Sequence, residues 1–363
     1  MRIICTVIND LSHDQRMHRI CSTLQGAGFE VTLVGRLLPD SPLLPHTTYR
    51  THRIRCRALA GKRFYMEYNW RLYRYLRTHP SEVICAVDLD TLLPATLVAR
   101  PGRKVVYDAH EWFSETPEVV HRPLIRGLWR TLGRWLVPRT SLRYTVGFTL
   151  AEQLEQDYGV PFSVIRNLSA NGNHEIKENS GGVILYQGML NPGRGIDVAI
   201  RALAYIPDCT LWIIGSGPEE NALKRLTHEL ELSERVWFAG FRAPAELPAL
   251  TGQAWLGLNL LEHSSPSYYY SFANKSLDYI QASLPSIQMD FPEYRLIQDQ
   301  YDVFQLLATL SPPALAAQIQ QLMDRPDRYA TLRANCRRAA TELCWEREAP
   351  KLIARYESLR HSG

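Results

Sequence analysis

Charged and imidazole side chains gather where one buried strand of the first half is predicted to end. Asp108-Ala109-His110-Glu111 follows the apolar run 104–107, and open α/β sheets bind ligands at the carboxyl ends of their strands. A metal site would need a second cluster at ligand spacing, which the sequence lacks. A nucleophile–base pair would need a Ser or Cys partner, which is also missing. The third interpretation is a neutral His110 that holds a sugar hydroxyl or a backbone carbonyl. A polar loop that only satisfies its own caps is the non-functional alternative.

A second chemical signal lies in the stretch 270–279, where a tyrosine-rich loop is predicted to run into a short helix. We expect Asn274 to cap this helix, whose first N–H groups and positive dipole end would bind a diphosphate. Asp278 lies one turn later on the same face, where its carboxylate would accept hydrogen bonds from ribose hydroxyls. An ordinary amphipathic helix, with Leu277 and Ile280 in the core, is the alternative.

Glycine-rich turns follow two predicted strands of the second half. The turn 188–195 follows the strand 183–187; its glycines let a ligand approach the backbone, and Arg194 supplies a cation that binds phosphate oxygens bidentately. Gly215-Ser216-Gly217-Pro218 follows the strand 211–214, and its proline fits the first position of the next helix. A tight strand-to-helix turn without a ligand is the alternative for this second motif.

These residues need a scaffold, and the alternation of strands and helices predicts one. The strand 3–8, the helix 13–25 and the strand 31–34 form a βαβ unit, which implies a parallel sheet. We expect Asn9 and Asp10 in the loop after the first strand, and Asp14 and Arg16 as an ion pair in the first turn of the helix. The alternation restarts after the loop-like linker 169–182, so the fold class is α/β with two Rossmann-like domains facing across a cleft. The predicted domains are an N-terminal domain at 1–168, completed by a C-terminal helix at about 345–363, and a C-terminal domain at 181–344.

Composition bounds the function. The chain has 363 residues, 45% hydrophobic and 21% charged, with a formal net charge of +4, which is typical of a globular protein and not of a nucleic-acid binder. No apolar run approaches the roughly 20 residues that cross a bilayer, and the N-terminus is predicted to be a strand, not a signal peptide. Seven cysteines without Cys-x-x-Cys spacing indicate reduced core thiols in a cytoplasmic protein.

A helix predicted over 121–139 carries arginines at every fourth position among leucines and tryptophans. Such a stripe would fit an anionic membrane at the inner face, as a peripheral contact. The alternative is a solvated helix face that packs its other side on the sheet. The four residues are Arg122, Arg126, Arg130 and Arg134.

Taken together, the motifs resemble those of retaining family 4 glycosyltransferases with the GT-B fold. A subgroup of that family has Asp-Ala-His-Glu as at 108–111 and an upstream Asp-Leu-Asp-Thr-Leu as at 88–92. In the donor segment, Tyr270 takes the position of a first family Glu and Asp278 that of a second Glu, while Met189 stands where the family has Arg and Arg194 where it has Lys. The GT-B fold also implies that the final helix crosses back to the first domain.

The resemblance implies transfer of a sugar from a nucleotide diphosphate sugar to a glycan, polysaccharide or lipid-linked hydroxyl acceptor, with retention at the anomeric carbon. It implies no metal and no other cofactor. The implied catalytic residues are His110 and Asp278. The implied donor sugar site is His110, Tyr270, Ser271 and Phe272, and the implied acceptor site is Asn9, Asp10 and Asp88. The nucleotide and diphosphate would be bound by Gly188, Arg194, Gly215, Gly217, Pro218, Phe241, Asn274, Lys275 and Asp278.

Two rival functions stay open at this point. A nucleotide-sugar epimerase shares the two-domain build, but it would need an acid/base set beyond His110. A scaffold or binding subunit without activity is the second, because Tyr270 and Met189 replace family Glu and Arg.

Overall fold

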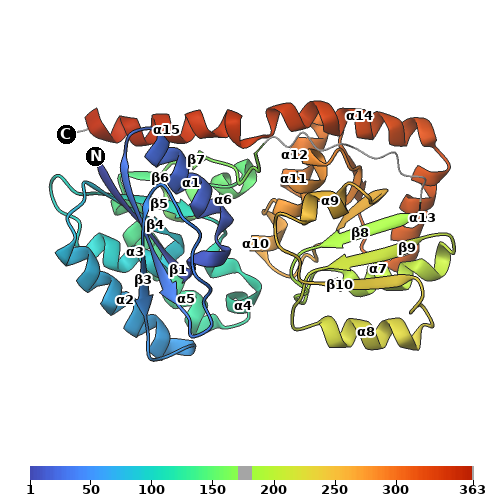
Figure 1. Ribbon diagram of the computed structural model, residues 1–363, viewed down its shortest axis with the longest axis horizontal. Coiled ribbons are helices and arrows are strands. Elements are labelled where there is room, and N and C mark those ends of the chain that lie inside the picture. Colours follow the sequence, from blue (N-terminus) through green and yellow to red (C-terminus); the bar gives the residue numbers. More distant parts are fainter. Residues whose placement is uncertain (171–181, 362–363) are drawn as a thin grey trace. The chain divides into compact units, whose positions relative to one another are not determined.

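The computed structural model describes residues 1–170 and 182–361, which form two compact units (Figure 1). The first unit contains Met1–Asn167 and Glu348–Gly363, and the second contains Leu168–Arg347. Most of the linker predicted at 169–182 lies outside the described residues. Each unit is an α/β domain with one parallel sheet, as the alternation of elements predicted.

The first unit is built on a seven-stranded sheet with the order β3-β2-β1-β4-β5-β6-β7, and every neighbouring pair is parallel. Val87 at the end of β4 pairs with Asp108 in β5, so the residues after these two strands lie at one edge of the sheet. The strands are β1 (Arg2–Asp10), β2 (Glu30–Leu37), β3 (Arg50–Arg55), β4 (Val83–Val87), β5 (Lys104–Ala109), β6 (Leu142–Thr145) and β7 (Ser163–Val164).

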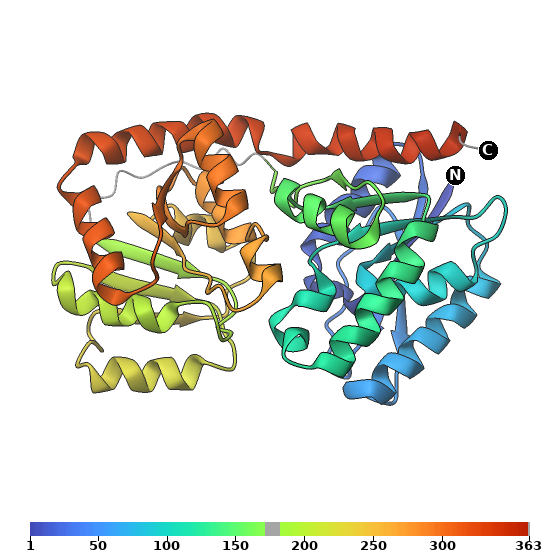
Figure 2. The same cartoon turned by 180° about the vertical axis from the view of Figure 1, so that it is seen from behind.

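Helices cover both faces of this sheet, and Figure 2 shows three of them, α2, α3 and α5, over one face. The apolar side of α2 is completely buried at Tyr68, Leu72 and Leu76, which pack on the core. The helices of this unit are α1 (Gln15–Gly26), α2 (Gly61–Thr78), α3 (Asp88–Leu97), α4 (Pro117–Val120), α5 (Pro123–Leu136) and α6 (Phe148–Tyr158), with short 3₁₀ turns at Leu11–His13, Phe113–Glu115 and Val137–Arg139.

The C-terminal helix α15 (Trp345–His361) completes the first unit, as the GT-B resemblance implied. Its Tyr356 is fully buried, and the Tyr356 hydroxyl lies 3.2 Å from that of Tyr144 in β6. Lys104 at the start of β5 donates from Nζ to the carbonyl of Leu359 at 2.8 Å. Residues more than 200 positions apart in the chain therefore share one core.

The second unit repeats the architecture with a six-stranded parallel sheet of order β10-β9-β8-β11-β12-β13. Its strands are β8 (Val183–Gln187), β9 (Thr210–Ile214), β10 (Val236–Gly240), β11 (Leu256–Asn259), β12 (Ser286–Met289) and β13 (Phe304–Leu307). Its helices are α7 (Ile196–Ala202), followed by a 3₁₀ turn at Leu203–Tyr205, α8 (Glu220–Glu229), α9 (Leu247–Thr251), α10 (Pro266–Tyr269), α11 (Asn274–Gln281), α12 (Pro292–Tyr301), α13 (Pro312–Met323) and α14 (Pro326–Glu342).

Three helices begin differently from the prediction, because the residue at the N-cap is not the one expected. Helix α11 begins at Asn274 itself, after Ala273, and no side chain of the described residues caps it. Helix α8 begins at Glu220, so Pro218 precedes the helix instead of opening it. Asp14 accepts a hydrogen bond from the Met17 amide at 3.0 Å as the cap of α1, so it does not form the predicted ion pair.

The seven cysteines are all buried, and none forms a disulfide, as their spacing indicated. Cys5 and Cys85 face each other in the register of β1 and β4. Among the helices formed by the described residues, none is both long and apolar enough to span a bilayer.

Asp10 ties the segment after β2 to the sheet. Asn9 and Asp10 were expected in a loop, but β1 extends to Asp10 because this carboxylate is bonded on several sides. It accepts from the Ser12 amide at 2.9 Å and the Ser12 hydroxyl at 2.6 Å, from Arg53 at 3.0 Å, and from the Ser41 hydroxyl. Burial raises the pKa of Asp10, but these hydrogen bonds and the Arg53 charge outweigh burial and lower it to about 2.

We predict that Asp10→Asn destabilises the protein in a pH-dependent way. A folded-state pKa of about 2, against an ordinary 3.8, corresponds to about 2 kcal/mol of stabilisation at pH 7. Because the folded-state pKa is depressed, this contribution is present above about pH 4 and is lost as the pH falls towards 2. Urea unfolding at pH 7 and pH 3 measures it; the deficit of the variant should shrink at pH 3.

Asp40→Asn is the matched control, since Asp40 is exposed on the same segment, and it should change the free energy of unfolding little. An Asp10→Asn deficit that is the same at both pH values would contradict the charged role of this carboxylate.

Candidate active site

His110 follows β5 at the edge of the first sheet, and two carboxylates flank it: Asp108 in β5 and Asp88, which follows β4. Its backbone N–H donates to Asp88 Oδ1 at 2.9 Å, and its Nδ1 lies 3.9 Å from Asp88 Oδ2. On the other side, Nε2 lies 3.3 Å from Oδ2 of Asp108, which is fully buried. The imidazole keeps 24% of its surface exposed, so it is held by the protein and still accessible to a ligand.

The two carboxylates control the charge of this ring. Burial by itself lowers the pKa of His110, but the charges of Asp108 and Asp88 outweigh burial and raise the pKa to about 9. The imidazole is therefore cationic at neutral pH, contrary to the neutral ring expected from the sequence. A cationic imidazole donates hydrogen bonds from both ring nitrogens and cannot act as a base.

Asp88 opens helix α3 in a strained conformation, with φ of 54°. Left-handed backbone is uncommon for a residue with a side chain, and such strain is often found at functional sites. Burial raises the pKa of Asp88. It also raises the pKa of Asp90, two residues further along α3, to well above the ordinary value.

Arg16 is the residue of this site that the sequence analysis missed. Instead of pairing with Asp14, it reaches Asp108 with Nη2 at 3.0 Å, since the first turn of α1 lies beside the end of β5. Its side chain is only 5% exposed. The sequence did show an arginine in the first turn of the helix that follows the first strand. It did not show the partner of this arginine, because Asp108 lies 92 positions away in the chain.

The three predicted acceptor residues differ in how much each offers a ligand. Asn9 is exposed, whereas most of the accepting capacity of Asp10 is used within the protein. Asp88 already accepts from the His110 amide. Asn9 and Asp88 therefore have more capacity for an acceptor than Asp10.

In the second unit, the turns after β8 and β9 are locked together by glycines. A Cβ at Gly215 would lie 1.9 Å from the carbonyl oxygen of Gly188, and a Cβ at Gly217 would lie 2.5 Å from that of Leu190. The two turns also share a hydrogen bond from the Gly188 amide to Ile214 at 2.9 Å. Close backbone packing accounts for Gly215 and Gly217 before any ligand is considered.

Lys275 is the most unusual charged group of this unit. It lies in the first turn of α11 and is 8% exposed, with Nζ 3.9 Å from the centre of the Tyr186 ring. A Cβ at Gly188 would come within 3.3 Å of the Lys275 side chain, so the glycine leaves room for it. Burial and then the charge of Arg194 lower the pKa of Lys275 well below its usual value, although Asp278 opposes the shift.

Arg194 supplies the second cation next to Lys275. Its guanidinium lies 4.7 Å from the centre of the Tyr268 ring, and its buried Nε–H has no hydrogen-bond acceptor among the described residues. A buried donor without an acceptor is costly, and an anion between these side chains would remove that cost. The geometry therefore supports an anion site at Lys275 and Arg194.

Asp278 and Asn274 lie four residues apart on the less buried side of α11, as predicted. The Asp278 carboxylate is oriented by the Ser169 hydroxyl and by Gln187 Nε2, each at 3.2 Å. Gln187 is in turn fixed by Thr251 at 2.7 Å. Asp278 is thus held by the end of β8, next to the glycine turn.

The predicted donor-sugar residues divide into core and surface. Phe272 is 6% exposed and packs against Tyr294 and Phe304, so its ring belongs to the core and leaves only its backbone for a ligand. Tyr270 is half-buried against Tyr269, and Ser271 donates to the carbonyl of Tyr268. Phe241, expected near the nucleotide base, is 65% exposed just after β10.

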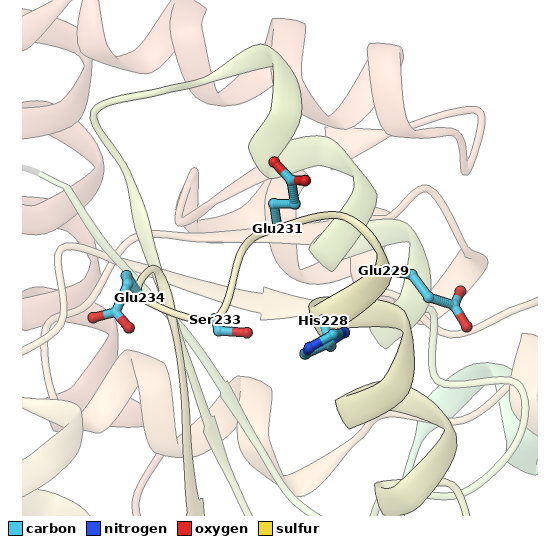
Figure 3. A pocket seen from close by; sticks show the side chains of 5 residues that line it. All are labelled: His228, Glu229, Glu231, Ser233 and Glu234. Atoms are coloured by element: carbon cyan, nitrogen blue, oxygen red, sulfur yellow. The ribbon is translucent and has the colours of Figure 1, made fainter.

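One hollow of the second unit is lined by acidic residues but has no site geometry. It lies between the end of α8 and the beginning of β10, at the amino end of the strand, and its carboxylates point in different directions (Figure 3). Across residues 1–170 and 182–361, no three His, Cys, Asp or Glu side chains are grouped so that they would hold a metal ion. The lining residues are His228, Glu229, Glu231, Ser233 and Glu234.

Comparisons with known proteins agree with the two-unit architecture. Residues 14–168 match the family described as Glycosyltransferase Family 4, and residues 181–325 match Glycosyl transferases group 1. The structure is similar to sucrose-phosphate synthase from Thermosynechococcus elongatus, with a TM-score of 0.79 at 18% identity over 100% of both chains. It is similar to Anabaena HepE, solved with UDP and glucose, with a TM-score of 0.77 at 15% identity over 100% of both chains.

A sequence relative is the lipopolysaccharide core biosynthesis glycosyltransferase LpsD of Rhizobium meliloti (strain 1021). It is 36% identical over 63 residues, which are 17% of this chain and 18% of that protein. The family matches lie one on each unit, and the structural likeness spans both. The chain belongs to the glycosyltransferases with the GT-B fold, with a family 4 domain in its first half and a group 1 domain in its second.

Proposed function

We propose that this glycosyltransferase takes a nucleoside diphosphate sugar as donor and transfers the sugar to a hydroxyl acceptor with retention at the anomeric carbon. The observation that carries the proposal is the pair of cations in the second unit. Lys275 is buried with a depressed pKa, and Arg194 has an unsatisfied buried donor. Both features are unfavourable in the free protein and would become favourable beside a diphosphate.

In the proposed step, the bond between the anomeric carbon and the diphosphate oxygen breaks, and its electron pair stays on the diphosphate. The acceptor hydroxyl oxygen forms the new bond to the anomeric carbon from the same face, and its proton passes to the leaving phosphate oxygen. Negative charge grows on the diphosphate as the bond breaks, so Lys275 and Arg194 stabilise the transition state more than the ground state.

The other side chains have assigned parts in this proposal. By the family resemblance, His110 donates a hydrogen bond to the donor sugar, and Asn9, Asp10 and Asp88 contact the acceptor. Asp278 accepts hydrogen bonds from the ribose hydroxyls, with its carboxylate oriented by Gln187. Phe241 lies by the base, where its exposed ring would stack.

The donor reaction is proposed to need no metal. Lysine, arginine and magnesium ions are alternative means of stabilising a transferring phosphate group, and Lys275 and Arg194 supply two positive charges from the protein. HepE of the same fold is solved with UDP and glucose, so UDP-glucose is the first donor to test.

The relative LpsD suggests a setting in lipopolysaccharide or other surface-glycan assembly, in which the acceptor is membrane-bound. Helix α5 offers a surface for such a contact: Leu124 and Leu128 are 89% and 66% exposed on one face, with Trp135 on the same side. We propose that this face makes a peripheral contact with an anionic membrane from the cytoplasmic side.

The arginines of α5 have a different part from the one predicted. Arg126 and Arg130 pair with Glu115, which is nearly buried, and Arg134 pairs with Asp157 at 2.8 Å. Part of the stripe therefore neutralises the protein's own carboxylates, and the apolar side chains carry most of the proposed contact.

The rival functions make different demands. An epimerase would need a base at neutral pH, and a cationic His110 is a poor candidate for one. A scaffold subunit would not need the anion site. Conversion of the donor without acceptor would indicate an epimerase, and absence of any nucleotide binding would indicate a scaffold.

We predict that Lys275→Met and Arg194→Ala each weaken UDP binding by about tenfold to a hundredfold, the loss of one hydrogen bond to a charged group. Binding to the wild type should also take up a proton at alkaline pH, since the diphosphate raises the depressed pKa of Lys275. Calorimetric titration in buffers of different ionisation enthalpy measures both quantities.

Arg201→Ala is the control, because Arg201 is exposed on α7 and should leave the affinity unchanged. Proton uptake that persists in Lys275→Met would assign the uptake to another group. An unchanged dissociation constant in both site variants would remove these residues from the diphosphate site.

Transfer from UDP-glucose to a glycan acceptor is expected to continue in excess EDTA and to keep the α configuration of the donor. Proton NMR of the product reports the configuration through the anomeric coupling constant. An inverted product would overturn the assignment of retention, and loss of activity that magnesium restores would overturn the metal-free assignment.

We predict that the double variant Leu124→Asp and Leu128→Asp reduces binding to anionic vesicles by tenfold or more, because exposed leucines bury apolar surface in the interface. Vesicle sedimentation with phosphatidylglycerol, compared with phosphatidylcholine alone, is the measurement. Leu296→Asp, at a half-exposed leucine of α12, is the control. Equal binding of all three proteins would exclude this face.

A further inference from the structure

The strongest unexplained feature of the first unit is the buried arginine beside His110. Arg16 is 5% exposed and Asp108 is fully buried. Burying such a pair costs about as much free energy as the attraction returns, so a buried pair by itself is weak evidence for a stabilising role. Another function must account for an arginine at this position.

The guanidinium of Arg16 is fixed on three sides. Nη1 and Nη2 both donate to the carbonyl of Ile165, just after β7, at 3.1 Å. Nη2 also reaches Asp108 Oδ1 at 3.0 Å, and Nε lies 3.0 Å from His110 Nε2. A planar guanidinium held by these contacts has one orientation. It therefore also restricts the orientation of the two side chains that it contacts, Asp108 and His110.

Arg16 and Asp108 meet the same nitrogen of His110 with opposite effects. The Nε–H of arginine only donates, so its contact with Nε2 is a hydrogen bond only while Nε2 carries no proton. Asp108 Oδ2 lies 3.3 Å from Nε2, and its negative charge favours the protonated ring. The charge of Arg16 lowers the pKa of His110, whereas Asp108 and Asp88 raise it.

We propose that Arg16 is a positioning residue for His110: through the shared carboxylate of Asp108 it fixes the plane of the imidazole, and through its donation to Nε2 it sets which ring nitrogen keeps the proton when the ring is neutral. With Nε2 facing Arg16 and Asp108, Nδ1 keeps its N–H in both the cationic and the neutral ring. This inference rests on the proposed role of His110 at the donor sugar. The geometry of Arg16 is independent of that role.

The test compares Arg16→Met and Asp108→Asn by NMR of the His110 ring nitrogens through a pH titration. Loss of the Arg16 charge should shift the midpoint of His110 upwards, and loss of the Asp108 charge should shift it downwards, each by about one pH unit or more. A role in packing alone would leave both midpoints where they are in the folded wild type, and that result would overturn the proposal.

Arg16→Lys keeps the positive charge but lacks the planar guanidinium, so it should leave the midpoint near that of the wild type. Above that midpoint, where the ring is neutral, it should allow the ring to change its tautomer. It is also the variant to use if Arg16→Met does not fold. A lysine variant with the wild-type tautomer would overturn the claim that the guanidinium orients the ring.

Kinetics distinguish this inference from the proposed function. Arg16→Met should lower kcat by about tenfold or more, while the dissociation constant for UDP stays unchanged, since the cations of the second unit are intact. If the wild type transfers no sugar, the proposed function fails and the NMR titration still decides the role of Arg16. A shifted midpoint with full kcat would overturn the functional part of the inference.

Discussion

A lysine buried with only a partial countercharge is the main electrostatic constraint of the second unit. Lys275 lies at the start of α11, where the helix dipole, burial and Arg194 all disfavour its ammonium. The ring of Tyr186 and the absence of a side chain at Gly188 make the space that it occupies. Keeping an ammonium charged out of water costs several kcal/mol, and burial therefore lowers the pKa of Lys275 so that it gives up its proton more easily when no anion is bound.

The first unit also buries charged side chains, but there each one lies beside a group of opposite charge. Around His110, positive and negative groups alternate: Arg16 meets Asp108, Asp108 meets the imidazole, and the imidazole meets Asp88. Each buried charge therefore has a neighbour of opposite sign, and the side chains have one low-energy arrangement. One unit thus has a ring held between countercharges, and the other has a buried lysine whose charge is only partly offset.

Most of the fold could be predicted because parallel strands buried on both faces are continuous apolar runs. The strand at Val183–Gln187 has the predicted ends. Glycine turns and the order of motifs indicated where each site residue would lie along the chain. Helix starts were less accurate, since Asn274 and Pro218 suit a cap or first turn by type but neither has that position here.

The choice of side-chain partners could not be predicted, because it depends on which elements become neighbours. Arg16 bonds with a carboxylate 92 positions away instead of one two positions away. Arg126 bonds with Glu115 across a turn, which changes a presumed membrane contact into an internal ion pair. Phe272 lies in a loop without apolar periodicity, so nothing in its neighbourhood indicated that its ring enters the core.

The discontinuity of the first unit has a consequence for synthesis on the ribosome. Tyr356 belongs to the same core as Tyr144 and Phe29, but the whole second unit is translated between them. Domains generally fold as units in the order in which they emerge. Here the second unit can close first, and the first unit waits, with apolar surface under the future position of α15 uncovered, until residue 356 has left the exit tunnel. During that interval the unit that begins first is the one that most needs protection from aggregation.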